Sequence, residues 1–224
     1  MDARSQEKIS WHYETLPRQT KKALDYFSEQ LWLKKSNWYL AGGTALALFT
    51  GNRKSVDLDF FSPSAHVHFK GFLKKLEVLP EWETTINKED TIYGELFGAK
   101  VSFSAYPFFV PKCTPINHGT VKVLQPRDIA VMKLIAISQR GRKRDFFDLY
   151  WCAHHLESID QLIQRLKIQY PTVAHDYHHI LKSMMYFEDA ESDPDPKIYF
   201  DTTWRKVKAF FEREIPKVME KLVR

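Results

Sequence analysis

The sequence has few cysteines, no long apolar run and no N-terminal signal pattern. Its two cysteines, Cys113 and Cys152, stand in unrelated contexts and are too few for a disulfide framework. The longest apolar runs, such as residues 134–137, are interrupted by charged residues within a few positions, which excludes a membrane-spanning helix. The first residues, Met1 to Lys8, lack the apolar core of a secretory signal. We therefore expect a cytoplasmic protein in a reducing compartment, with no membrane partner.

A strong charge of either sign is also missing. The chain has 33 lysines and arginines against 28 acidic residues, for a net charge of +5. Such a mild excess suits phosphate ligands and permits an RNA partner without requiring one. The basic residues are unevenly placed, because four of them gather at Arg140, Arg142, Lys143 and Arg144. With 44% hydrophobic residues, the 224-residue chain has ample material for a packed core.

The pattern of apolar residues changes near residue 124. Before this point, strand-like alternation is mixed with amphipathic helical segments, and after it only helical patterns follow. The predicted strands cover residues 38–40, 56–61, 83–86, 91–96, 99–106 and 121–124, with a loop at 107–117. The predicted helices cover residues 14–33, 44–49, 68–79, 126–139, 144–155, 159–168, 173–185 and 202–223. Pro216 is expected to begin, kink or split the last helix. We therefore expect an α+β fold, with a mixed domain at 1–124 and a helical domain at 125–224.

Two motifs on consecutive predicted elements carry the strongest chemical signal. Gly42, Gly43 and Thr44 stand between a strand and a short helix, where glycine lets backbone N–H groups approach an anion at the helix N-terminus. Asp57 and Asp59 follow in the next predicted strand, where they point to the same side and lie roughly 7 Å apart. Two such carboxylates can share divalent cations, and hard oxygen ligands suit Mg²⁺. A phosphate cradle beside metal-binding carboxylates indicates phosphoryl or nucleotidyl transfer.

The same motifs have a purely structural interpretation, a tight turn followed by a solvated strand face. The apolar neighbours of Asp57 and Asp59 argue against it, because adjacent carboxylates near a core repel each other unless cations compensate. Just before them, Arg53 and Ser55 can bind a nucleotide phosphate through a guanidinium fork and a hydroxyl. The alternative for Arg53 is solvation in a loop.

The predicted helix at 126–139 carries a lysine among apolar residues. Lys133 either extends to solvent or points to a ligand in a cleft. Arg140 lies seven residues further along and on nearly the same face, so the two cations together suit a triphosphate or an RNA backbone. A solvated helix end that complements the helix dipole would explain Arg140 but not Lys133.

Two aspartates share one face of the next predicted helix. Asp145 and Asp148 are three residues apart, and aromatic neighbours bind this helix into a core. Asp145 either caps the helix, pairs with Arg144, or has a catalytic role. Asp148 is expected to orient Lys133 or Arg140 across the helix pair.

These residues together resemble a known family. The run from Leu40 to Leu46, followed by Arg53 to Phe61, is similar to a signature of the AbiEii/AbiGii-type nucleotidyltransferase toxin family. That family belongs to the DNA polymerase β-like nucleotidyltransferase superfamily. Its second signature is a lysine helix followed by an Arg-Asp-x-x-Asp helix, and it is matched by Lys133, Arg140, Arg144, Asp145 and Asp148.

The resemblance implies a nucleotidyltransferase fold, in which a small mixed sheet with flanking helices is followed by a helical domain that closes a cleft. It implies that Mg²⁺ at Asp57 and Asp59 binds an NTP. Gly42 to Thr44 would cradle the β- and γ-phosphates, while Lys133 and Arg140 would neutralise charge from the helical side.

The implied reaction transfers a nucleotide from the NTP to an acceptor hydroxyl, either of an RNA such as tRNA or of a protein. The basic turn at Arg142 to Arg144 is where such an RNA would be received. The protein would be the toxin component of a toxin–antitoxin system, so a cognate antitoxin is the expected partner.

One position departs from the superfamily pattern, which usually has a third carboxylate on a neighbouring strand. The predicted strand at 99–106 has Ser102 and Ser104 there, and a hydroxyl is a poor metal ligand and no base near neutral pH. The chain then uses two carboxylates, recruits Asp145 or Asp148, or receives Glu95 from the preceding strand. The alternative function is a nucleotide- or partner-binding member of the fold without transfer activity. A more distant alternative is a phosphohydrolase built on the same metals.

Overall fold

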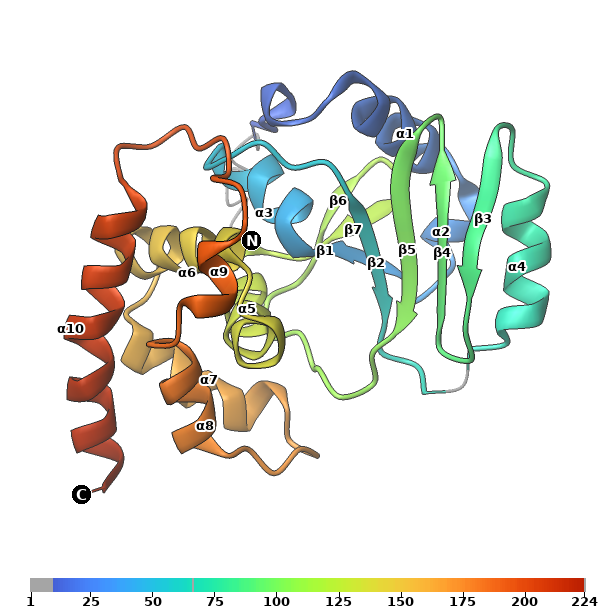
Figure 1. Ribbon diagram of the computed structural model, residues 1–224. Helices are drawn as coiled ribbons and strands as arrows, with labels where there is room; N and C mark the ends of the chain where they lie inside the picture. The colour runs from blue at the N-terminus through green and yellow to red at the C-terminus, as the bar shows by residue number, and fades with distance from the viewer. Residues whose placement is uncertain (1–9, 66, 224) are drawn as a thin grey trace, which may run out of the picture.

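The computed structural model describes residues 10–65 and 67–223, and the expectation about a signal core in Met1 to Lys8 concerns residues outside this description. A twisted sheet occupies one side of the molecule, and a group of helices that includes the long C-terminal helix occupies the other (Figure 1). The fold is α+β, as predicted. Within the described residues, no helix combines the length and the hydropathy that crossing a membrane requires.

The described strands form one mixed, seven-stranded sheet in the order β3-β4-β5-β2-β1-β7-β6. The central strand β2 pairs antiparallel with β1 and parallel with β5, while β1 pairs parallel with β7. The strands are β1 (Tyr39–Ala41), β2 (Leu58–Ser62), β3 (Trp82–Asn87), β4 (Thr91–Leu96), β5 (Ala99–Ala105), β6 (Ile116–His118) and β7 (Val121–Val123).

Helices flank the sheet and then form the C-terminal half. Those before the last strand are η1 (Tyr13–Thr15), α1 (Arg18–Ser28), α2 (Leu31–Lys34), α3 (Gly42–Thr50) and α4 (Phe69–Glu77). Those after it are α5 (Pro126–Arg140), α6 (Lys143–His155), α7 (Ile159–Gln169), α8 (Tyr177–Ser183), α9 (Glu188–Glu191) and α10 (Trp204–Val223). In Figure 1, α10 lies along the edge of the molecule that is opposite to α4.

The two faces of β2 serve different purposes. Leu58 and Phe60 are buried, and the Phe60 ring stacks on Phe103 of β5 with centroids 4.7 Å apart. Phe27 of α1 and Phe72 of α4 pack edge-on against Phe103, so these helices cover this face of the sheet. Because strand side chains alternate, Asp59 and Phe61 must face the other side, which is the side of α5.

Several predicted boundaries were wrong. The single helix expected at 14–33 is divided into η1, α1 and α2, because Pro17 caps the start of α1 and Gln30 is extended before α2. The loop expected at 107–117 ends in the first two residues of β6, which pairs with β7, and the short helix α9 was missed. Pro216 neither begins nor splits the last helix, since it lies inside α10.

Candidate active site

A cavity of about 690 Å³ lies between the sheet and α5. It is lined on the sheet side by residues of β2, β4 and β5, and on the helical side by one face of α5. Of the residues singled out from the sequence, those that line it are Gly42, Gly43, Arg53, Ser55, Asp57, Asp59, Lys133 and Arg140. Thr44, Asp145 and Asp148 are not among its lining residues but touch groups that are.

The turn from β1 into α3 needs both of its glycines. Gly42 is the first residue of α3 and has φ of +70°, a left-handed conformation that L side chains rarely adopt. A Cβ there would lie 2.9 Å from Asp59 Oδ2, and one at Gly43 would lie 2.3 Å from Arg53 Nη2. The N-terminus of α3 therefore opens into the cavity, and the backbone of its two glycines lies directly against Asp59 and Arg53. Such an exposed helix N-terminus is what an anion-binding site requires.

The two motif aspartates have different supports. Asp57 precedes β2 rather than lying in it, and the Thr44 hydroxyl donates to its carbonyl oxygen. Asp59 lies within β2, and its Oδ1 accepts a hydrogen bond of 2.8 Å from Ser102 Oγ. Burial raises the pKa of Asp59, with a further contribution from Asp57, while the bond from Ser102 opposes the rise.

This donor set fits a divalent cation. Two carboxylates face one cavity beside a helix N-terminus, and oxygen donors are the ligands that Mg²⁺ prefers. Within the described residues, no basic side chain lies within 4.0 Å of the Asp59 carboxylate, so the local charge of this pair is incompletely compensated. The nearest compensation for Asp57 is Arg144, whose Nη1 lies 3.7 Å from Asp57 Oδ2.

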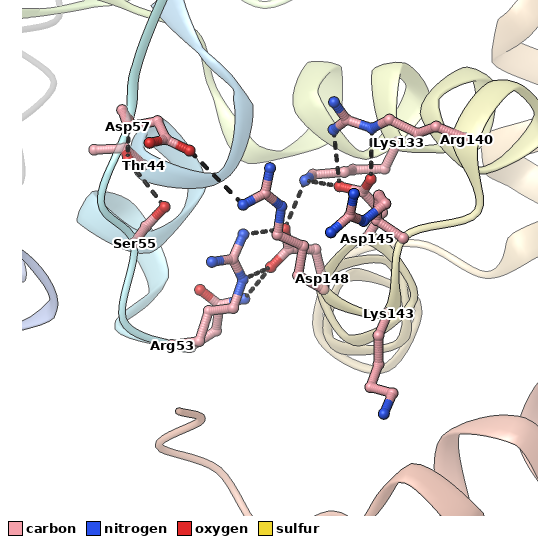
Figure 2. Close-up of polar contacts among 12 residues, drawn as sticks. Thr44, Arg53, Ser55, Asp57, Lys133, Arg140, Lys143, Asp145 and Asp148 are labelled. Carbon is pink, nitrogen blue, oxygen red and sulfur yellow. Dashed lines mark hydrogen bonds and ion pairs between the residues drawn. The ribbon is translucent and has the colours of Figure 1, made fainter. Parts of the chain in front are cut away.

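Lys133 is the central residue of the opposite wall of the cavity, and two aspartates form ion pairs with its ammonium group (Figure 2). Its Nζ lies 2.5 Å from Asp145 Oδ1 and 2.7 Å from Asp148 Oδ2, and all three side chains are buried. Arg140 Nε donates to Asp145 Oδ2 at 3.0 Å. Burial alone would raise the pKa of Asp145, but Lys133 and Arg140 hold it below its ordinary value.

Arg53 completes this chain of alternating charges. Its guanidinium binds Asp148 through two hydrogen bonds, Nε to Oδ1 at 2.7 Å and Nη2 to Oδ2 at 2.8 Å. The side chain of Asn52 donates to the same carboxylate. Burial would raise the pKa of Asp148, but Arg53 and Lys133 together hold it well below its usual range. The Arg53 guanidinium, which was expected to bind phosphate, is thus hydrogen-bonded to protein groups. A role of Arg53 in nucleotide binding stays a prediction.

A segment before α10 fixes the Arg53 loop. Lys54 N donates to Lys197 O, and Tyr199 N donates to Asn52 O, which forms a short bridge between the two segments. The same segment accepts bonds from the start of α6, because Arg142 Nε donates to Asp193 Oδ2 at 2.8 Å. Lys143 points away from the cluster in Figure 2 and donates to Asp193 and Asp195. Arg142 and Lys143 are therefore not a free basic surface.

The strand on which the superfamily resemblance leads us to expect a third carboxylate is β5, and it carries Ser102 and Ser104 and no acidic residue. In the parallel pair of β2 and β5, Ser102 stands directly opposite Asp59. Glu95 lines the same cavity from β4, but its cross-strand partner is Lys100. The carboxylates of Asp145 and Asp148 form ion pairs with lysine and arginine side chains instead of lining the cavity. Within the described residues, no group of three acidic, histidine or cysteine side chains is placed to hold a metal.

Some site residues were not found from the sequence. Asn52 and Asp193 carry no motif, and their roles follow from contacts between segments far apart in the chain. The partnership of Arg144 with Asp57 likewise joins the two halves of the molecule. Met132 and Tyr106 line the cavity but look like ordinary core residues in the sequence.

Comparison with known proteins identifies the family. The family described as nucleotidyl transferase AbiEii toxin, type IV toxin–antitoxin system, matches residues 30–223. The chain belongs to the AbiEii nucleotidyl transferase toxin family. The family resemblance inferred from the sequence motifs is thereby confirmed. A relative in Aquifex aeolicus (strain VF5), itself uncharacterized, is 33% identical over 190 residues, which cover 83% of this chain and 89% of the relative.

Solved structures share the fold of this AbiEii-family protein. JHP933 from Helicobacter pylori aligns over 92% of this chain and 94% of its own, with a TM-score of 0.55 and 19% identity. The nucleotidyltransferase toxin MenT4 from Mycobacterium tuberculosis H37Rv aligns over 82% of this chain and 76% of its own, with a TM-score of 0.51 and 16% identity. The nucleotidyltransferase fold expected from the sequence is therefore present.

Proposed function

We propose that this protein transfers a nucleotide from a Mg²⁺-bound NTP to an acceptor hydroxyl. The observation that carries the proposal is the meeting of three features in one cavity. Asp57 and Asp59 form one wall, the N-terminus of α3 opens beside them, and Lys133 and Arg140 form the opposite wall. Anionic phosphates and a divalent cation together satisfy this arrangement of charges.

Each of these three features has a role in that reaction. The backbone N–H groups at Gly42 and Gly43 bind phosphate oxygens, and Arg140 and Lys133 stabilise the negative charge that moves onto the leaving pyrophosphate. Asp57 and Asp59 would hold Mg²⁺, which supplies charge neutralisation at the transferring phosphoryl group. A new bond forms between the acceptor oxygen and the α-phosphorus as the bond to pyrophosphate breaks, and the acceptor hydroxyl loses its proton to solvent water.

The proposed biological setting is a toxin–antitoxin pair in the cytoplasm, where NTPs are available. Membership of a type IV toxin family supports a cognate antitoxin as partner. The proposed acceptor is an RNA such as tRNA, with a protein hydroxyl as the other acceptor class to be tested.

The test is label transfer from each α-³²P-labelled NTP to bulk tRNA, or to the antitoxin, in the presence of Mg²⁺. We expect transfer by the wild type and none by the double variant Asp57→Ala, Asp59→Ala. Asp201→Asn is the matched control, because its side chain is fully exposed and is not among the residues that line the cavity. Label transfer that survives the double substitution would rule out the proposed site.

Ser102 supports a second candidate function, nucleotide binding without transfer. A serine stands where the third carboxylate is expected, so no base from that strand activates the acceptor. Calorimetry that detects Mg²⁺–NTP binding, alongside no transfer to RNA, protein or water, would favour this candidate. Robust turnover would eliminate it.

A further inference from the structure

The cavity has two chemically different ends. Its charged lining residues lie near the first residues of β2 and β5 and the last turns of α5. At the other end of the same strands stand Phe61 of β2, Ser104 of β5 and Tyr106 just after it. The first turn of α5 lies at this end, because Asp128 accepts a hydrogen bond from Gln169 and the neighbouring Tyr170 is bonded to Tyr106. From this part of α5, Ile129 and Met132 line the cavity.

The two walls change from polar to apolar in the same direction. Phe61 follows Asp59 by two residues, so their side chains share a face and are roughly 7 Å apart along the strand. On the helical wall, Ile129 and Arg140 are separated by about 16 Å along α5. The change on both walls means that one elongated ligand meets charge at one end and apolar surface at the other.

The apolar end has the form of an aromatic corner. The rings of Phe61 and Tyr106 are 5.6 Å apart between centroids and inclined at 62°, so they present differently oriented surfaces. Met132 lines the same cavity from α5 and is only partly buried. A flexible thioether adapts to a flat ring placed against it.

We propose that this apolar end binds the nucleobase of the donor nucleotide. The inference rests on the proposed function, because it takes the charged end as the triphosphate site. A nucleoside triphosphate has the polarity of the cavity, with anionic phosphates at one end and a flat aromatic ring at the other. The cavity volume of about 690 Å³ lies within the range of small-molecule sites.

Hydrogen-bonding groups at this end are few. The Ser104 hydroxyl is bonded to Thr91 Oγ1 at 3.2 Å, and the Tyr106 hydroxyl is bonded to Tyr170 at 3.2 Å. Stacking and apolar contact therefore provide most of the base affinity, and such contacts tolerate different bases. Ser104 is the residue placed to discriminate among them.

The test compares nucleoside triphosphates with tripolyphosphate, which shares their phosphate chain and lacks both the ribose and the base. Binding of each Mg²⁺-NTP and of Mg²⁺-tripolyphosphate is measured by calorimetry on the full-length wild type, and NTPs are expected to bind about tenfold more tightly. Met132→Ala should weaken NTP binding about tenfold and leave tripolyphosphate binding unchanged. Met132→Leu should retain NTP affinity, and Met219→Ala, another partly buried methionine that does not line the cavity, is the matched control.

The outcomes separate the base site from the phosphate site. If tripolyphosphate binds as tightly as every NTP to the wild type, the base site is wrong while the phosphate site stands. If neither ligand binds, the proposed function itself fails. If Met132→Ala leaves NTP affinity unchanged but raises the KM for the acceptor, the apolar end receives the acceptor and the proposal is overturned. Mg²⁺-ribose 5′-triphosphate, which keeps the sugar and lacks the base, decides the question on the wild type even if Met132→Ala does not fold. It should bind about as weakly as tripolyphosphate, and binding as tight as that of the NTPs would overturn the base site.

Discussion

Lys133 lies at the centre of a network of ion pairs between side chains in this protein. Its ammonium is buried between two aspartates, each of which binds a further arginine. Buried charges are stable only when they are paired and hydrogen-bonded, so removing one member leaves the others with a large desolvation cost. Asp148 is the most connected member, because it accepts from Arg53, Asn52 and Lys133.

We predict that Asp148→Asn destabilises the protein by about 3 kcal/mol or more at pH 7, because buried Arg53 loses its carboxylate partner and buried Lys133 loses one of its two. The pKa of Asp148 in the folded state lies below its unfolded value of about 3.9. A depressed carboxyl pKa contributes stability that is present above the unfolded value and lost as the pH falls through the folded value. The difference between wild type and variant should therefore shrink below about pH 4.

Urea unfolding of both proteins between pH 3 and pH 7 measures this difference. Asp201→Asn, with a fully exposed carboxylate, should follow the wild type at every pH. A difference between wild type and Asp148→Asn that stays constant down to pH 3 would contradict the assignment.

Among the elements, the junction of β1 and α3 carries the strictest geometric demand. Gly42 combines a left-handed backbone with close approach to Asp59, whereas Gly98 in the turn between β4 and β5 has φ of +76° with no atom within 4 Å of a Cβ. Substitutions at these two glycines therefore distinguish the effect of backbone strain alone from the effect of strain combined with crowding at the site.

We predict that Gly98→Ala costs about 1 kcal/mol of stability and leaves activity unchanged, because only the backbone strain is added. Gly42→Ala adds the same strain and also moves the Asp59 carboxylate, so transfer activity should fall at least tenfold. Urea unfolding and initial rates of label transfer on both variants test this. Equal activity in the two variants would show that the approach of Gly42 to Asp59 is unimportant.

Across the whole molecule, the segment before α10 connects the helical half to the Arg53 loop. Asp193 binds both Arg142 and the backbone N–H of Lys143, which anchors this segment at the start of α6. The bonds of Lys54 and Tyr199 across the bridge are formed by the residues that follow this anchor in the same segment.

We predict that Asp193→Ala speeds hydrogen exchange at the amides of Lys54 and Tyr199, because the bridge opens more often once its anchor is lost. Exchange at Phe60, inside the sheet, should be unchanged and serves as the internal control. Native-state hydrogen exchange measured by NMR reports each amide separately. Equal rates at Lys54 in variant and wild type would mean that the bridge is held by other contacts.

Local patterns were sufficient for the framework of this protein. The pattern of apolar residues predicted a strand at 56–61 and a helix at 126–139, where the structure has β2 and α5. The two family signatures also predicted the fold, because they contain the glycines and aspartates that the turn and strand require. Such features depend on neighbours a few residues away, so the chain order alone reveals them.

The pairing of charges depended on tertiary packing. Arg53 and Asp148 are 95 residues apart, and nothing in either local pattern indicates that the guanidinium binds this carboxylate rather than a phosphate. Ser102 comes to stand opposite Asp59 only through the register of β2 and β5. The sequence by itself determined which charged residues are available to the candidate site. The tertiary structure decided which of those charges already compensate one another, because Coulomb interactions depend on distance in space and on burial, and not on separation along the chain.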